Sequence, residues 1–502
     1  MDRLDRGQRR AAAVALLLVL AFAWLGARGL WETDEGRYTA VALQMQQDGD
    51  WLLPHLFDVK PHVTKPPLTY WALAAALHLG GRHELAARLP NALAFLAAVW
   101  LVWRIARRLF PEGAWWPPLL YALSPLVQGG LLFVTTDTLL ALWELVAMDG
   151  FVRAWDERRR GRGDGTAGLV QMGVGFGLAF LTKGPPGLLP LLGVLAFVLL
   201  ERRRGRSVRL WCSGGLLLGL VLGGGWYALL LHHHPDLWRY WLGHEVMDRV
   251  ASGAHHRNPQ WYGGLLVYGP TLLVAALPGL WLLPGARRGA RERWWRALSP
   301  PRWRDRPEVA LPLLWLAIPL AVFLLARSRL PLYLLPLAAP LVLLLGWPLA
   351  RRFPAITPGQ RRGLAGWAVL LLAVRLVMAH LAVPQDSRRL ARELRPLLPA
   401  TVSRLVFVNA NPYYGLRFYL DVPVEPVRTS RRGPWRAWGE SYRTVREVLP
   451  LDDGGWVYVV PDRWWSRWEE QVTRTGRHLR LLGRVRDKRL VSLEPGEARG
   501  GD

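Results

Sequence analysis

The chain of 502 residues has a single cysteine, Cys212, so no intramolecular disulfide can form. It is also poor in acidic residues, with 38 Asp and Glu against 64 Lys and Arg and a formal net charge of +26. In a soluble protein this balance would favour nucleic acid as a partner. Here the arginines cluster at the ends of apolar segments, where they orient helices and contact anionic lipid, and we therefore expect no nucleic-acid partner.

The sequence also lacks the alternating polar and apolar segments of a soluble domain, and 51% of its residues are hydrophobic. Crossing the hydrocarbon core of a bilayer takes about 20 predominantly apolar residues. About eleven segments meet or approach that length, near Ala11–Leu30, Leu85–Trp103, Pro117–Phe133, Leu139–Val152, Gly168–Leu181, Pro186–Leu200, Leu210–Leu231, Gly263–Leu283, Ala310–Leu325, Leu330–Leu349 and Leu364–Val383. The sequence therefore predicts an α-helical polytopic membrane protein with about 11–13 transmembrane helices.

Basic clusters separate these segments and fall on one side of the membrane if the spans alternate. They are Arg107–Arg108, Arg158–Arg160, Arg202–Arg204, the stretches 287–306 and 351–362, and the arginines of residues 3–10. By the positive-inside rule that side is the cytoplasm. The first span resembles a signal peptide, but its apolar run is longer than usual, and we interpret it as an uncleaved anchor. The opposite side receives the loop 31–84, the turns at Asp137 and Lys183, the loop 232–262 and the chain after Val383.

The composition changes after Val383, which predicts two domains, a transmembrane domain of residues 1–383 and a domain of residues 384–502 outside the membrane. Short strands are predicted at Arg404–Val408, Val424–Val427, Trp456–Val460 and Leu479–Leu482, with helical stretches near Tyr413–Leu420 and Arg463–Thr475. This pattern is typical of a small α/β domain. The apolar run Leu68–Leu79 is too short to span, and we interpret it as an interfacial or re-entrant segment.

The loop after the first span carries charged and aromatic residues in a distinctive order. It begins with Trp31-Glu-Thr-Asp34-Glu35-Gly-Arg37-Tyr38, continues with Gly49-Asp50-Trp51, and ends with Lys65-Pro-Pro-Leu-Thr-Tyr-Trp71. Adjacent carboxylates at a membrane boundary are either catalytic groups or interfacial charges that mark the end of a helix. The same two interpretations apply to Lys65, Asp137 and Lys183.

These motifs, followed by Ala87-Arg88-Leu-Pro90, resemble the bacterial aminoarabinose transferases of lipid A and their relatives among the protein O-mannosyltransferases. The resemblance continues in Thr135-Thr-Asp137, in Leu181-Thr-Lys183-Gly, in His244 and Arg249, and in Ser328-Arg-Leu-Pro331-Leu-Tyr333. It covers most of residues 31–340 and is weak in the cytoplasmic loops and the C-terminal domain. It implies a GT-C-type membrane fold in the bacterial inner membrane, with the active site and the C-terminal domain facing the periplasm.

A polyprenyl-phosphate-linked sugar has a phosphodiester leaving group, so its site needs cations for the phosphate and a carboxylate that takes the proton of the acceptor hydroxyl. The resemblance makes Asp34 that base, Asp137 a second catalytic acid, and Glu35 a neighbour that raises the pKa of Asp34 by like-charge repulsion. The substrate-binding candidates are Lys65, Lys183, Arg249, Tyr333, Arg37 and Arg88.

Several histidines in the loop 232–262 raise the question of a metal site, with His244 as the candidate ligand. In the aminoarabinose transferases a glutamate directly before the Lys-Pro-Pro motif shares a zinc ion with the loop histidine. Thr64 occupies that position here, and one expected ligand is therefore missing. Solvated histidines at a membrane surface are the alternative, and no cofactor is firmly implied.

The residues favour an inverting glycosyltransferase that moves a sugar from undecaprenyl phosphate to lipid A, another envelope glycan or a protein. A single displacement with one base would invert the anomeric carbon. The alternative is a transporter or lipid flippase, which usually shows repeated halves and polar residues near the midplane of its spans. Ionisable residues are sparse in the predicted spans, and the charges gather at one face, which favours the transferase.

Overall fold

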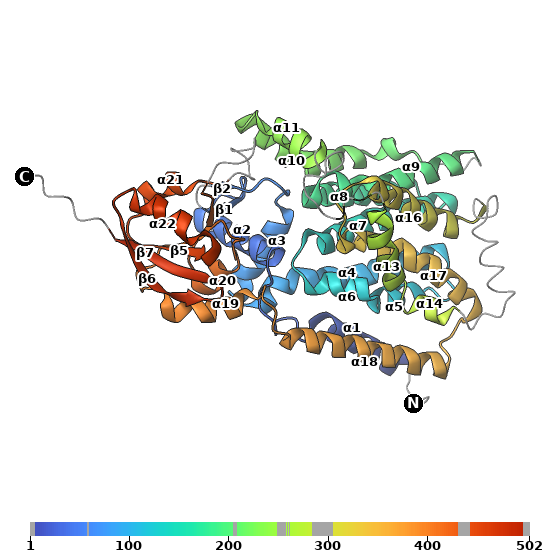
Figure 1. The fold of residues 1–502 in the computed structure, drawn as a ribbon. Helices are drawn as coiled ribbons and strands as arrows, with labels where there is room; N and C mark the ends of the chain where they lie inside the picture. Colours follow the sequence, from blue (N-terminus) through green and yellow to red (C-terminus); the bar gives the residue numbers. More distant parts are fainter. Residues whose placement is uncertain are drawn as a thin grey trace, which may run out of the picture. The chain divides into compact units, whose positions relative to one another are not determined.

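The structure is a computed structural model that describes residues 6–57, 60–203, 208–247, 258, 260, 262–283, 305–429 and 442–494. The chain divides into two compact units. We call residues 1–27, 65–72 and 88–380 the helical unit, and residues 28–64, 73–87 and 381–502 the mixed unit. Each unit is described by itself, and Figure 1 labels their elements.

The helical unit is built from the long apolar segments of the sequence (Figure 1). Its main helices are α1 (Arg6–Phe22), α4 (Glu84–Leu109), α5 (Trp116–Ala122), α6 (Pro125–Leu132), α7 (Thr136–Arg159), α8 (Thr166–Lys183), α9 (Leu189–Arg202), α10 (Gly215–His233), α13 (Gly263–Ala275), α14 (Gly279–Leu282), α16 (Pro307–Leu325), α17 (Ala338–Arg352) and α18 (Pro358–His380). Short 3-10 helices, Pro185–Leu188 and Pro331–Leu337, lead into α9 and α17. Every predicted span overlaps one of these elements, and six segments among the described residues are long and apolar enough to cross a membrane.

The predicted span Pro117–Phe133 is two short helices rather than one. Helix α5 ends at Ala122, and α6 begins at Pro125, because proline has no N–H for a helix interior but fits the first turn of a new helix. The break leaves the hydroxyl of Ser124 free of the helix, and it donates to the carbonyl of Ala275, 2.9 Å away. At the break itself, the carbonyl of Ala122 accepts from the side-chain amide of Gln128 at 2.7 Å. A freed backbone group is thus paired, as hydrocarbon surroundings require.

Glycines bring the backbones of α7, α8 and α10 into direct contact. A Cβ added at Gly173 would overlap the carbonyl oxygen of Gly215, and one added at Gly219 would lie 2.5 Å from the carbonyl oxygen of Gly173. Between α7 and α8, a Cβ at Gly150 would lie 2.6 Å from the carbonyl oxygen of Gly168. Small residues at helix interfaces allow such close approach in membranes, where packing replaces the hydrophobic drive between helices.

Helix α7 is less apolar than the predicted span Leu139–Val152 suggested. Glu144 and Asp149 are both buried in it, Asp149 completely. Asp149 forms ion pairs with Arg104, at 3.0 Å, and Arg108, at 2.6 Å, and it accepts from the side chain of Gln171. Two arginines of α4 thus pair with a carboxylate of α7, which lowers the cost of burying that charge in the bundle.

The mixed unit contains a five-stranded sheet in the order β4-β3-β5-β7-β6. The strands are β3 (Arg404–Val408), β4 (Val424–Val427), β5 (Trp456–Pro461), β6 (His478–Val485) and β7 (Lys488–Glu494). The first three pair in parallel, and β7 is antiparallel to β5 and β6. Helices α19 (Ser387–Leu394), α20 (Leu416–Leu420), α21 (Val445–Val448) and α22 (Trp465–Thr473) accompany the sheet, whose fully buried side chains include Val406, Tyr458 and Trp468.

Most predicted elements of this region agree with the structure, but helices α19 and α21 were not predicted, and two further differences concern β7 and α20. Strand β7 was not predicted, because its polar residues Lys488, Arg489 and Ser492 hide the alternation of its buried ones. The helix expected near Tyr413–Leu420 is confined to α20, Leu416–Leu420, and Gly415 stands directly before it. The prediction therefore captured the α/β character of the region and placed one helix boundary wrongly.

Most of the first outer loop, residues 31–64 and 73–84, belongs to the mixed unit as well. It forms α2 (Asp34–Asp48) and a small hairpin of β1 (His55–Phe57) and β2 (Lys60–Pro61). Helix α3 (Leu68–Gly80) follows, and its 13 residues are too few to cross a bilayer. Helix α2 is closed by Gly49, which adopts a left-handed conformation with φ of 71° and donates its N–H to the carbonyl of Met45.

Candidate active site

In the helical unit, the structure brings together three of the predicted site residues. The ammonium of Lys183, the last residue of α8, forms an ion pair with the carboxylate of Asp137 in the first turn of α7. The same nitrogen lies 4.4 Å from the centre of the Tyr333 ring, in a cation–π contact. Only 11% of the Lys183 side chain and 7% of the Asp137 side chain are exposed. A cation held this far from water attracts an anion more strongly than an exposed one does.

Local geometry explains why Asp137 lies at this position. Thr135 is extended and caps α7, and its hydroxyl oxygen accepts from the N–H of Asp137 at 3.3 Å. The turn before it is held by Asn91 of α4, whose side-chain amide donates to the carbonyl of Phe133 at 2.7 Å. Thr138 donates to the carbonyl of Gly130. Sequence reasoning missed Asn91, although it directly follows the Ala-Arg-Leu-Pro motif that carried the resemblance.

The two other predicted ligands of the helical unit differ in exposure. Arg88 of α4 is fully buried, and its guanidinium donates to the carbonyl of Leu25 at 3.0 Å. Lys65 is only partly buried and stands three residues before Leu68, the first residue of α3. Arg88 is therefore held in the helical unit by a hydrogen bond, whereas Lys65 is partly exposed.

In the mixed unit, Asp34 opens α2. Its carboxylate pairs with the guanidinium of Arg37 at 2.5 Å, and the two side chains are 37% and 28% exposed. A carboxylate in the first turn of a helix is favoured by the partial positive charge of that end. Asp34 is thus a partly exposed carboxylate that water reaches, paired with the neighbouring Arg37.

Glu35, in contrast, points into the unit. It is buried, and its two oxygens accept from the guanidinium of Arg28 at 2.5 and 3.0 Å. The backbone N–H of Trp31 donates to the same carboxylate at 2.9 Å. The charge of Glu35 is compensated by a buried, two-pronged ion pair, which is the strongest geometry that arginine forms with a carboxylate. Neither Arg28 nor its pairing was predicted.

Glu32 is a further carboxyl group that the sequence analysis did not single out. Its Oε1 accepts from the hydroxyl of Ser387 and from the N–H of Gly415, both at 2.6 Å. Burial raises the pKa of this carboxyl to about 8, since the two hydrogen bonds and Arg37 only partly offset the loss of solvation, while Glu35 adds to the rise. Near neutral pH Glu32 is therefore largely protonated.

Two predicted residues lie outside what the structure describes. Arg249 falls in the stretch 248–257, and for His244 only the backbone, within Tyr240–Met247, is described. Among the described residues, no group of three or more His, Cys, Asp or Glu side chains could hold a metal ion. The hydroxyl of Thr64 lies 3.1 Å from Nε2 of His62, and a threonine hydroxyl is a poor zinc ligand. The residues at the family's glutamate position thus do not fit zinc.

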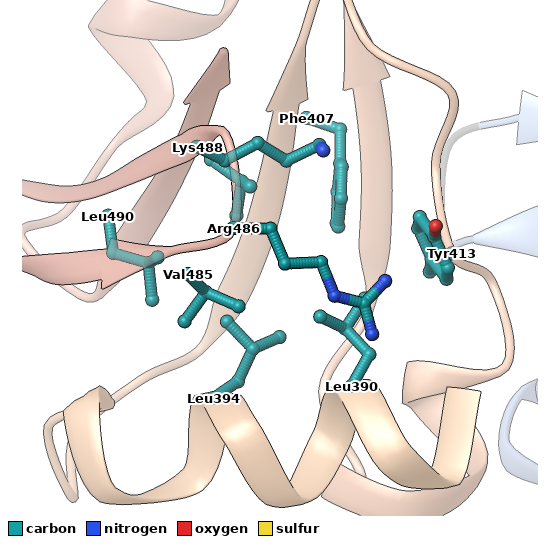
Figure 2. Close-up of a pocket in the computed structure, with 9 residues that line it drawn as sticks. Leu390, Leu394, Phe407, Tyr413, Val485, Arg486, Lys488 and Leu490 are labelled. Carbon is teal, nitrogen blue, oxygen red and sulfur yellow. The ribbon is translucent and has the colours of Figure 1, made fainter. Parts of the chain in front are cut away.

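Figure 2 shows a small pocket in the mixed unit, away from the predicted site residues. Its walls are mostly apolar, from Leu390, Leu394, Phe407, Tyr413, Val459, Val485 and Leu490, with Arg486 and Lys488 completing the lining. Both cations already have partners: Arg486 pairs with Glu393 at 3.0 Å, and Lys488 pairs with Asp487. We therefore assign no substrate to this pocket.

Comparison with known proteins agrees with the fold. A family profile described as dolichyl-phosphate-mannose-protein mannosyltransferase matches residues 64–227. This match covers part of the chain, and together with the apolar helices it defines the class as a polytopic membrane protein.

Named relatives narrow the class further. The undecaprenyl phosphate-alpha-4-amino-4-deoxy-L-arabinose arabinosyl transferase of Edwardsiella ictaluri is 34% identical over 343 residues, which cover 66% of this chain and 58% of that protein. One from Pseudomonas fluorescens is 32% identical over 413 residues, covering 80% of this chain and 71% of the relative. The chain therefore belongs to the family of these arabinosyl transferases, as its motifs predicted. It spans about three fifths of the length of the first relatives that it matches.

Solved structures confirm the predicted fold class. The crystal structure of ArnT from Cupriavidus metallidurans bound to undecaprenyl phosphate matches with a TM-score of 0.72 at 20% identity, covering 97% of this chain and 98% of that chain. The same protein in its apo state matches with a TM-score of 0.71. The chain thus has an α-helical, multi-pass membrane fold with a small α/β region.

Proposed function

We propose that this protein is an inverting glycosyltransferase of the bacterial inner membrane that takes a sugar from an undecaprenyl-phosphate-linked donor. Its acceptor would be lipid A, another envelope glycan or a protein on the periplasmic face. The observation that carries the proposal is the nearly buried group of Lys183, Asp137 and Tyr333 at the ends of membrane helices. An ammonium in that setting suits a lipid-linked phosphate.

The reaction would be one displacement at the anomeric carbon. The acceptor hydroxyl oxygen forms the new bond to that carbon while its proton passes to the carboxylate of Asp34, and the bond from the carbon to the phosphate oxygen breaks. The electron pair of that bond leaves with undecaprenyl phosphate. Lys65, Lys183 and Arg249 are the cations that we propose to stabilise this leaving group.

The contacts of the carboxylates favour Asp34 over its neighbours as the base. Asp34 is over a third exposed, so a hydroxyl can approach it. Glu35 is buried against Arg28, and Asp137 is buried against Lys183, so both are held by a cation. We propose that Glu35 fixes the loop around Asp34 and that Asp137 fixes the ammonium of Lys183. No step passes through a metal ion.

The test is sugar transfer by the purified full chain. The protein is incubated in lipid with undecaprenyl-phosphate-linked 4-amino-4-deoxy-L-arabinose or other radiolabelled polyprenyl-phosphate sugars, together with envelope fractions, and the labelled product is separated into lipid and protein. We expect label in one acceptor and release of undecaprenyl phosphate. Movement of the donor across the bilayer with no release would instead support the transporter alternative, for which the buried Glu144 of α7 is the favouring observation.

A further inference from the structure

The C-terminal part of the chain contacts the helix that carries Asp34 at both of its ends. Both partners belong to the mixed unit. One short segment, Gly415–Tyr419, makes these contacts, and we call it the clamp segment. It consists of Gly415 and the first four of the five residues of α20.

At the beginning of α2, the contact runs through Glu32. The N–H of Gly415 and the hydroxyl of Ser387 both donate to the same oxygen of this carboxyl group. The backbone also pairs, since the N–H of Glu32 donates to the carbonyl of Gln385 at 3.0 Å and the N–H of Ser387 donates to the carbonyl of Leu30 at 2.9 Å. The residues just before Asp34 are therefore fixed by four hydrogen bonds to the C-terminal part of the chain.

The approach at this end leaves no room for side chains. A Cβ added at Gly36 would lie 2.5 Å from the backbone nitrogen of Gly415, and one added at Gly415 would lie 2.6 Å from the hydroxyl of Ser387. Contacts under 3.0 Å force a shift of the backbone. Two glycines, one on each side, thus permit α2 and the clamp segment to touch directly.

At the other end of α2, the contact runs through Arg417 of the clamp segment. This arginine is buried, and its guanidinium donates to the side-chain carbonyls of Gln44 and Gln47, the second at 2.6 Å. Gln44 in turn donates to the carboxylate of Asp48 at 2.6 Å. A buried guanidinium without its acceptors would be costly, so this contact resists separation.

Tyr419, the last residue of the clamp segment, makes a third contact with the chain around α2. The hydroxyl of Tyr419 accepts from the N–H of Leu30 at 2.9 Å and donates to Glu84 at 2.8 Å, and Arg388 pairs with the same glutamate at 2.5 Å. The backbone that leads into Asp34 is thus held from both sides of Trp31.

We propose that the C-terminal domain positions the candidate base: the clamp segment, through Arg417 on Gln44 and Gln47 and through Gly415 on Glu32, fixes the orientation of α2. This inference rests on the proposed function of Asp34. Glu32 and Arg417 are positioning residues, because they act through α2 and not on the substrate. A misplacement of about 1 Å at a reacting group costs roughly 100-fold in rate, so loss of the clamp should lower turnover while donor binding persists.

The test compares Arg417→Met with the matched control Arg480→Met in full-length protein in lipid. Arg480 is an exposed residue of β6 that pairs with Glu494 at 3.3 Å. For Arg417→Met we expect turnover to fall on the order of 10–100-fold, with KM for the donor within about threefold, and the amides of α2 to exchange hydrogen about tenfold faster or more. Arg480→Met should leave both unchanged.

Two further variants keep the result decisive if Arg417→Met folds poorly. Ser387→Ala removes one hydrogen bond to Glu32 and should lower turnover by a smaller factor, again with faster exchange in α2. The double variant Gln44→Arg with Arg417→Gln swaps the two side chains. It restores a guanidinium between α2 and α20 and should recover much of the turnover. Unchanged turnover in Arg417→Met and Ser387→Ala would overturn the proposal, as would unchanged exchange in α2. If the wild-type protein transfers no sugar, the proposed function is wrong, and the exchange measurement alone decides whether the clamp orders α2.

Discussion

Two ion pairs, one in each unit, differ in how much of their side chains is exposed to water. Lys183 and Asp137 are 11% and 7% exposed, whereas Arg37 and Asp34 are 28% and 37% exposed. A buried pair holds its charges in fixed positions and penalises any loss of a partner. An exposed pair contributes little to stability, but its carboxylate remains open to a reacting hydroxyl. Under the proposed function, the pair in the helical unit is suited to act as a fixed cation, and the carboxylate in the mixed unit is suited to act as an accessible base.

The largest effect is expected from Asp34→Asn, which removes the base and keeps the shape. Turnover should fall by roughly 10²–10⁴, because general base catalysis contributes on that order. Donor affinity should change little, since the carboxylate does not bind the phosphate. Rates of sugar transfer and donor binding in lipid measure both quantities.

The matched control is Asp421→Asn, a change of the same kind at a carboxylate that is 75% exposed and pairs with Arg82. Its turnover should equal that of the wild type. If Asp34→Asn also transfers sugar at the wild-type rate, Asp34 is not the base and Asp137 becomes the candidate.

The next effect concerns stability and separates the two pairs directly. Lys183→Met leaves Asp137 buried without its cation and should lower the free energy of unfolding by about 3–5 kcal/mol. Arg37→Gln, at the exposed pair, should lower it by less than about 1 kcal/mol. Denaturant titration of the full chain in mixed micelles, followed by tryptophan fluorescence, measures both.

The double variant Lys183→Met with Asp137→Asn is the internal check. It removes the uncompensated charge, and much of the lost stability should return. Equal losses for Lys183→Met and Arg37→Gln would contradict the contrast between the pairs.

A smaller effect is expected for Lys65→Ala, because this ammonium is only partly buried. The variant should weaken binding of undecaprenyl phosphate by about 2–5 kcal/mol, as truncation of a partly desolvated charged contact does. Lys488→Ala is the control, since that lysine pairs with Asp487 in the β6–β7 hairpin. Donor affinity of the two variants is compared by titration in detergent, and equal affinities would place Lys65 at the membrane interface only.

A further effect is a pH dependence of stability that belongs to Glu32. Burial raises the pKa of this carboxyl from 4.5 to about 8, so the folded protein holds a proton that the unfolded chain releases between those pH values. The free energy of unfolding attributable to Glu32 is therefore full below about pH 4.5 and decreases as pH rises to about 8. Glu32→Gln should flatten this part of the stability curve. Unfolding curves between pH 5 and 8.5 test it, and an identical slope in both proteins would exclude a proton on Glu32.

Much of this fold could be predicted from the sequence, because many elements are recognisable from their own residues alone. The length and apolarity of segments such as Pro358–His380 predict spans without any knowledge of their neighbours. The strands Arg404–Val408 and Val424–Val427 appear as predicted, because short runs of Val, Leu and Phe in a polar region have few alternatives. Strand β7 was missed because its composition does not predict a strand. It is a strand because it pairs with β5, which is distant in the sequence.

Some residues of the candidate site could likewise be predicted from the sequence, and others could not. The motifs brought Asp137 and Lys183 to notice because each stands in a short turn between spans, and the structure pairs them. Their roles in catalysis remain predictions. Arg28 and Arg417 could not be found from the sequence, because they are two among many arginines, and only tertiary contact reveals that each is buried against α2 or its first turn.

The glycine contacts between α8 and α10 have a further consequence for where the ammonium of Lys183 stands. Gly173 and Gly177 meet the backbone of α10, so α8 can neither slide nor rotate without collision, and Lys183 follows six residues after Gly177 on the same helix. Each residue of an α-helix advances about 1.5 Å and turns about 100°. Deleting one residue between Gly177 and Lys183 would therefore swing the ammonium about a quarter of a turn around the helix axis, away from Asp137, while every side chain of the pair stayed in the protein. The number of residues between Gly177 and Lys183, as much as their identity, determines where this ammonium lies.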